Sequence, residues 1–127
     1  MLDVNPDTVR RLIELARAFH AKEEVVIPEE PDSPSDDWAL QSLADHAGDE
    51  VFEEFRSIVE DLEPDQQQQV VALFWLGRGD ADPTDWQALL RQAGDSWNKR
   101  TAEYLIVHPF LAEHLTDGLE ALGYSDA

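Results

Sequence analysis

The residues best suited to chemistry in this 127-residue chain lie in one short segment, Leu76-Gly77-Arg78-Gly79-Asp80. Arg78 stands between two glycines, at an expected bend between helices, and its planar fork of donors suits a carboxylate or a phosphate. The alternative role is structural: Arg78 pairs with Asp80, with Asp82 or with the last carbonyl groups of the preceding helix, and so locks the turn. The sequence favours the structural role. Arg78 and Asp80 are therefore named only as part of a candidate interaction surface.

No other motif predicts a catalytic, cofactor or metal site. The segment 80–85 is similar to the opening of a calcium loop, but Asp85 and Arg91 stand where an EF-hand has its glycine and its glutamate. His108 and His114 are six residues apart, whereas zinc ligands on one helix face are four apart. The chain has no cysteine. We predict no catalytic residue, no cofactor and no metal ligand, and an enzyme is disfavoured, although a metal site assembled from distant residues stays open.

Four tryptophans are many for a chain of this length. Trp75 and Trp86 fall on apolar stripes at helical spacing, and we interpret both as core residues. Trp38 and Trp97 have polar neighbours, which is typical of an aromatic side chain that anchors an interface. Trp38 and Trp97 therefore join the candidate interaction surface.

The elements that must position these residues are all helices. Apolar residues recur at helical spacing, and no strand or hairpin signal occurs. Residues 70–76 are apolar on every side, which is typical of a helix covered all round. We predict a compact all-α bundle of six or seven short helices around a central apolar helix at about 64–77, which ends through left-handed glycines at Gly77 and Gly79. The expected helices cover residues 6–22, 36–47, 50–62, 64–77, 83–94, 99–107 and 109–122.

The chain is expected to form a single helical domain, residues 1–127, with three parts. Residues 1–22 are an N-terminal helix, residues 23–37 an acidic proline-rich loop, and residues 38–124 the helical core. The loop has three prolines and seven carboxylates in fifteen residues, too little apolar surface to pack as a helix.

The net charge of −19 is concentrated in the middle of the chain. Residues 23–85 have nineteen acidic and only two basic side chains, Arg56 and Arg78. Such a field repels nucleic acid and anionic membranes and attracts basic surfaces. No apolar run reaches the roughly 18 residues of a membrane span, and the first residues lack the pattern of a secretory signal. We expect a cytoplasmic protein that binds neither nucleic acid nor membrane directly.

The segment 71–80, Val-Ala-Leu-Phe-Trp-Leu-Gly-Arg-Gly-Asp, resembles the signature of the bacterial DUF3775 family, a domain of unknown function. Trp86, the segment 101–105 with Pro109, and the closing pattern Gly118-Leu119 to Leu122-Gly123 also fit the family. The resemblance covers about residues 45–124. It implies a small helical domain and brings no catalytic residues with it.

These observations favour a non-enzymatic protein-interaction module. Its partner would be a basic or amphipathic protein, or a second copy of the chain. Two alternatives stay open: a DNA-mimicking inhibitor whose carboxylates imitate phosphates, and a small enzyme or metal-binding protein whose site no motif reveals.

Overall fold

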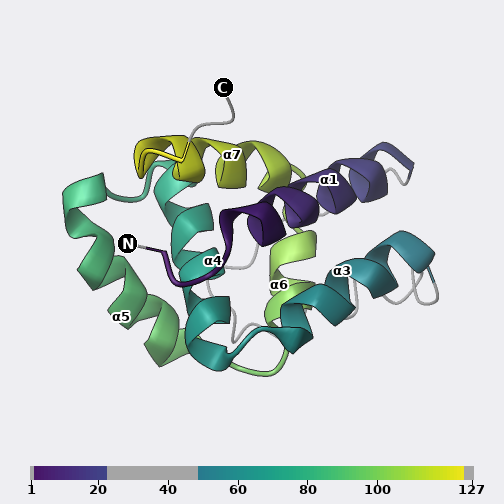
Figure 1. Ribbon diagram of the computed structural model, residues 1–127, viewed down its shortest axis with the longest axis horizontal. Helices are drawn as coiled ribbons and strands as arrows, with labels where there is room; N and C mark the ends of the chain where they lie inside the picture. Colours follow the sequence, from purple (N-terminus) through teal and green to yellow (C-terminus); the bar gives the residue numbers. More distant parts are fainter. Residues whose placement is uncertain (1, 23–48, 125–127) are drawn as a thin grey trace.

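A computed structural model describes residues 2–22 and 49–124, and both stretches are helical, without a β-strand (Figure 1). The elements are α1 (Pro6–Lys22), α3 (Glu50–Asp61), α4 (Pro64–Arg78), the short 3₁₀-helix η2 (Pro83–Asp85), α5 (Trp86–Ser96), α6 (Thr101–Ile106) and α7 (Leu111–Ala121). The prediction of an all-α bundle is confirmed. The predicted loop at 23–37 and helix at 36–47 lie outside the described residues. None of the described helices combines the length and the apolar character that crossing a bilayer requires.

The ends of the helices follow local signals in the sequence. The side chain of Asn5 accepts a hydrogen bond from the Asp7 backbone at 2.9 Å, and Asp49 caps α3 in the same way. Asp82 caps η2 together with Asp85 in a capping box. Gly79 ends α4 with a φ of 94°. Three expected boundaries are shifted by two residues: α5 continues to Ser96 rather than stopping near 94, α6 begins at 101 rather than 99, and α7 begins at 111 rather than 109.

Helix α4 lies in the middle of the molecule. It packs against α7, α5 and α6, while α1 packs against α7 and α3 (Figure 1). Every side chain from Val70 to Leu76 is buried, because neighbours cover α4 on all sides. The predicted central helix is therefore confirmed, and its last turn places Arg78 where the core meets solvent.

The prediction that Gly77 adopts a left-handed conformation is wrong. Gly77 lies inside α4, and among the described residues only Gly79 and Gly123 have a positive φ. Gly77 instead permits close packing: a Cβ there would stand 2.8 Å from the backbone nitrogen of Gly118 and closer still to the carbonyl group of His114. The glycine is thus required by the contact between α4 and α7.

Two of the four consecutive glutamines in α4 hold neighbouring segments in place. Gln67 donates to the carbonyl groups of Val59 and Leu62 at the end of α3, at 3.0 and 3.1 Å. Gln69 accepts from the backbone of Asp3 at 2.8 Å, which attaches the segment before α1. Both glutamines are buried, so these hydrogen bonds satisfy polar groups that water does not reach.

Candidate functional site

Arg78, the last residue of α4, makes a forked ion pair with Asp80. Its Nε lies 3.2 Å from both carboxylate oxygens and its Nη2 lies 2.6 Å from one of them. The Arg78 Cζ also lies 4.9 Å from the centre of the Phe74 ring, within the range of a cation–π contact. The side chains of Arg78 and Asp80 remain 25% and 40% exposed. The pair therefore stiffens the turn after α4 and still presents charged groups to solvent.

A cluster of rings lies beneath this turn. The centre of the Phe74 ring is 4.5 Å from that of His108 and 5.6 Å from that of His114. Tyr104 packs edge-on against His108, with ring centres 4.9 Å apart. The indole of Trp75 donates to the Tyr104 hydroxyl at 2.9 Å. The cluster joins α4, α6 and the first turns of α7 into one support for the turn.

Two titratable groups of this cluster, His108 and Tyr104, are buried. His108 is 1% exposed, and its Nδ1 donates to the Tyr104 carbonyl oxygen at 2.8 Å. Burial, together with the positive charge of Arg78, lowers the pKa of His108 to about 4, so the imidazole is neutral at pH 7. Burial also raises the pKa of Tyr104. Neither group is accessible to a substrate.

One large hydrophobic side chain points outward beside this cluster. Phe110 is 55% exposed, and no other large hydrophobic residue in the described ranges is exposed. Its ring centre lies 6.4 Å from that of His114, which is itself partly buried. Phe110, His114, Phe74 and Arg78 therefore form one continuous row of contacts. We use the name Arg78 surface for the accessible residues of this row together with Asp80, the ion-pair partner of Arg78. These residues are Phe110, His114, Arg78 and Asp80.

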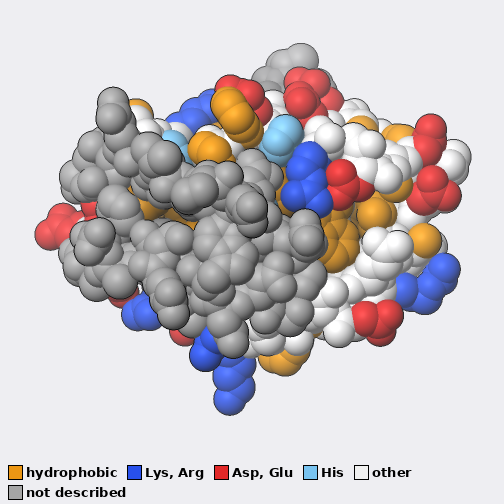
Figure 2. Space-filling model, turned by 180° about the vertical axis from the view of Figure 1, so that it is seen from behind, with side chains coloured by type: hydrophobic (Ala, Val, Ile, Leu, Met, Phe, Trp, Pro, Cys, Tyr) orange, Lys and Arg blue, Asp and Glu red, His pale blue; other side chains and the backbone are white. Residues whose placement is uncertain are grey.

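Figure 2 shows one face of the molecule, seen from behind relative to Figure 1. On it, hydrophobic side chains reach the surface beside basic, acidic and histidine side chains. Protein-binding surfaces are enriched in aromatic and arginine side chains, and the Arg78 surface has one of each in Phe110 and Arg78.

The structure places the four predicted surface residues differently. Arg78 and Asp80 lie together, and Trp38 lies outside the described residues. Trp97 is partly buried, and its Nε1 donates to Gln67 at 2.8 Å. Gln67 precedes Arg78 by eleven residues in α4, about 16 Å along the helix, so Trp97 does not join the Arg78 surface. Trp75 and Trp86 are 6% and 3% exposed, which confirms that both are core residues.

Sequence reasoning missed Phe110 and His114. Position 110 precedes the leucine stripe of α7, so a large apolar residue there has no place on the buried face of the helix. This mismatch was the available signal. For His114 the sequence gave only a weak signal, its spacing from His108. Within 2–22 and 49–124, no three histidine and carboxylate side chains are arranged to hold a metal ion.

The fold and this site define a small all-α domain whose central helix ends in an arginine–glycine turn supported by a ring cluster. A family model described as a protein of unknown function, DUF3775, matches residues 52–124. The chain belongs to this family. The match runs from α3 to the end of α7, includes the whole Arg78 surface, and leaves out α1. No curated protein and no solved structure matches the chain.

Proposed function

We propose that this protein is a non-enzymatic interaction module of the bacterial cytoplasm that docks a basic or amphipathic protein segment on the Arg78 surface. The exposure of Phe110 carries the proposal. Burying a phenylalanine side chain contributes about 1.5–3 kcal/mol, and because this ring is 55% exposed, part of that contribution remains available to a partner that covers it.

The charges around the Arg78 surface favour a basic partner. Asp80 is followed by Asp82 and Asp85, which are also exposed, and the whole chain has a net charge of −19. Such a field accelerates the approach of a positively charged segment and repels a negatively charged one. A partner with an apolar side chain for Phe110 and a flanking lysine or arginine for Asp80 fits both features.

A binding role has more support than the two alternatives. The ring cluster buries His108 and Tyr104, so neither of them can act as an acid or a base on a substrate. For a DNA mimic, the carboxylates along α3 would have to stay unpaired to imitate phosphates. Arg56 instead pairs with Glu53 and Glu60, and Arg11 pairs with Glu54.

The test is a comparison of Phe110→Ser with the wild-type protein in affinity capture from a lysate of the source cells. Ala121→Ser is the matched control, because it changes an exposed apolar residue near the other end of the same helix. Proteins that require the Arg78 surface should be retained by wild type and by Ala121→Ser, and should decrease about tenfold with Phe110→Ser, equivalent to about 1.4 kcal/mol.

Equal retention of all captured proteins by Phe110→Ser would contradict the proposal. Sedimentation of the purified protein separates the two kinds of partner. A dimer that Phe110→Ser abolishes identifies a second copy as the partner, whereas a monomer with Phe110-dependent capture identifies another protein.

A further inference from the structure

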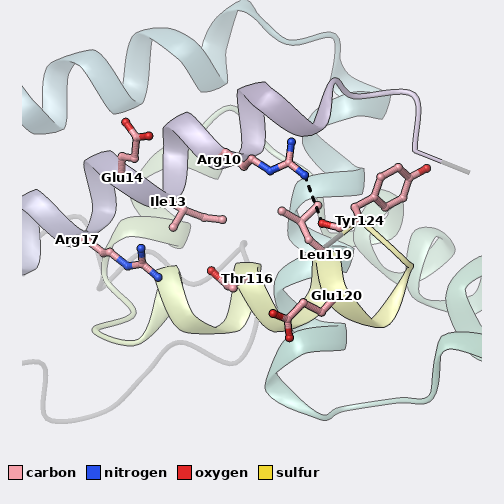
Figure 3. Close-up of a pocket in the computed structure, with 8 residues that line it drawn as sticks. All are labelled: Arg10, Ile13, Glu14, Arg17, Thr116, Leu119, Glu120 and Tyr124. Atoms are coloured by element: carbon pink, nitrogen blue, oxygen red, sulfur yellow. Dashed lines mark hydrogen bonds between the residues drawn. The ribbon is translucent and has the colours of Figure 1, made fainter. Parts of the chain in front are cut away.

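A second surface feature, distinct from the Arg78 surface, is a groove between α1 and α7 (Figure 3). Its volume is about 290 Å³, and its apolar lining is provided by Ile13 of α1 and Leu119 of α7. Thr116 and Tyr124 contribute polar atoms, and four charged side chains complete the walls. The two apolar side chains are 6% and 3% exposed, which makes them a floor rather than a patch open to solvent.

Two of the four charged side chains in the groove are already compensated. Arg10 pairs with Asp7 at 2.8 Å and also donates to the carbonyl oxygen of Tyr124. Glu14 pairs with Arg11 at 3.1 Å. Arg10 and Glu14 therefore each have an ion-pair partner within the protein, although Arg11 is shared between Glu14 and Glu54.

Arg17 and Glu120 are the two charges that remain. Both side chains are exposed, and neither forms an ion pair with any residue in the described part of the chain. Figure 3 shows the Arg17 guanidinium reaching from α1 toward Thr116, with Glu120 farther along α7. Thr116 and Glu120 are four residues apart and so lie one above the other on one face of the helix. The groove thus offers one cationic and one anionic group above an apolar floor.

We propose that this groove binds a zwitterionic α-amino acid with an apolar side chain. The ligand carboxylate pairs with Arg17, whose guanidinium fork matches a carboxylate. Its ammonium group pairs with Glu120, and its side chain covers Ile13 and Leu119. A volume of 290 Å³ corresponds to about ten water molecules at about 30 Å³ each, and the nine non-hydrogen atoms of leucine fit it.

The overall charge of the protein selects for a ligand without net charge. The net charge of −19 repels a ligand whose only charged group is a carboxylate, despite the arginine in the groove. A simple cation is attracted everywhere on this surface and gains nothing specific in the groove. A zwitterion is neither repelled nor drawn elsewhere, and both of its charged groups find partners.

The experiment is a titration of the full chain, followed by amide chemical shifts, with four probes that separate these contributions. L-leucine has all three features, N-acetyl-L-leucine lacks the ammonium, L-leucinamide lacks the carboxylate, and glycine lacks the apolar side chain. Leucine should shift amides of α1 and α7 in a saturable way. Each of the other three should bind at least about tenfold more weakly. A lack of saturable shifts with leucine, or equal binding of any of the three analogues, overturns the proposal.

Variants identify the groove as the location of binding. Arg17→Gln and Glu120→Gln should each weaken leucine binding at least about tenfold. Arg91→Gln on α5 and Glu113→Gln on α7 are matched exposed controls outside the groove and should leave it unchanged. Unchanged binding with either groove variant contradicts the assignment, and thermal melts confirm that each variant is folded. Phe110→Ser should not affect leucine binding, so this inference and the proposed interaction surface stand or fall separately.

Discussion

Replacing Gly77 by alanine should test the contact on which the fold depends. The added Cβ would stand 2.6 Å from the carbonyl carbon of His114, whereas carbon atoms in contact are about 3.5–4.0 Å apart. The obstructing atoms belong to the backbone of α7, so no side-chain rotation relieves the clash. The carbonyl oxygen of His114 lies closer still, so helices α4 and α7 must separate by at least about 1 Å, and a gap of that size removes roughly a quarter to a half of each dispersion contact across it.

The expected loss of stability follows from two opposing contributions. Overpacking costs about 1–3 kcal/mol and sometimes more, and a clash between two backbones belongs at the upper end of that range. Alanine is better than glycine inside a helix by about 1 kcal/mol, which offsets part of the cost. We expect Gly77→Ala to lower the free energy of unfolding by about 2 kcal/mol or more, and the melting temperature by roughly 8 °C.

Gly94→Ala is the matched control, because Gly94 also lies within a helix, α5. Its new Cβ would meet only the mobile end of the Gln68 side chain, at 3.1 Å. Here the helix preference of alanine should dominate and raise stability by up to about 1 kcal/mol. Urea denaturation followed by far-UV circular dichroism compares the two variants. If Gly77→Ala were as stable as wild type, or less harmful than Gly94→Ala, the close approach of α4 and α7 would be refuted.

Four further predictions concern the core, the buried histidine, the turn and the net charge. Leu73→Ala should lower the free energy of unfolding by about 2–5 kcal/mol in denaturant melts, because Leu73 is fully buried in α4; a loss below about 1 kcal/mol would contradict the architecture. The pKa of His108 is about 4 in the folded protein and 6.5 in the unfolded chain, so the unfolded chain binds a proton more readily. The free energy of unfolding should therefore fall by about 3 kcal/mol as the pH drops from 6.5 to 4. His108→Gln should remove that part of the slope in melts across this range, and an unchanged slope would mean that His108 is not buried in its neutral form. Arg78→Ala should lower the free energy of unfolding by about 1–3 kcal/mol. Arg78→Lys should recover only part of that loss, because an ammonium group cannot form the forked ion pair with Asp80. If Arg78→Ala were as stable as wild type, the role of Arg78 would be recognition. Sodium chloride should raise the melting temperature, because a net charge of −19 repels itself and the Debye length falls from about 10 Å at 0.1 M to about 3 Å at 1 M; a flat or falling trend would indicate carboxylates already compensated by bound cations.

The sequence by itself determined the helices and most of their ends. Asn5, Asp49 and Asp82 cap the elements that follow them, and Gly79 and Gly123 end the elements that precede them. These signals are readable because a cap satisfies backbone groups within a few residues of itself. The position of α4 at the centre was equally readable, since a helix without a polar face must be covered on all sides.

Only the tertiary structure decided which residues form the candidate site. Phe74 lies before α5 and precedes His108 by 34 positions and His114 by 40, and nothing local indicates that its ring meets theirs. The role of Gly77 could not be predicted from the sequence either. A left-handed helix end and a close contact between two helices both require glycine, and the residues that distinguish the two roles lie about forty positions away on α7. The groove between α1 and α7 likewise exists only once the two ends of the described chain pack together. Contacts of this kind depend on how helix faces dock, and periodicity fixes the face of each helix but not the partner it meets.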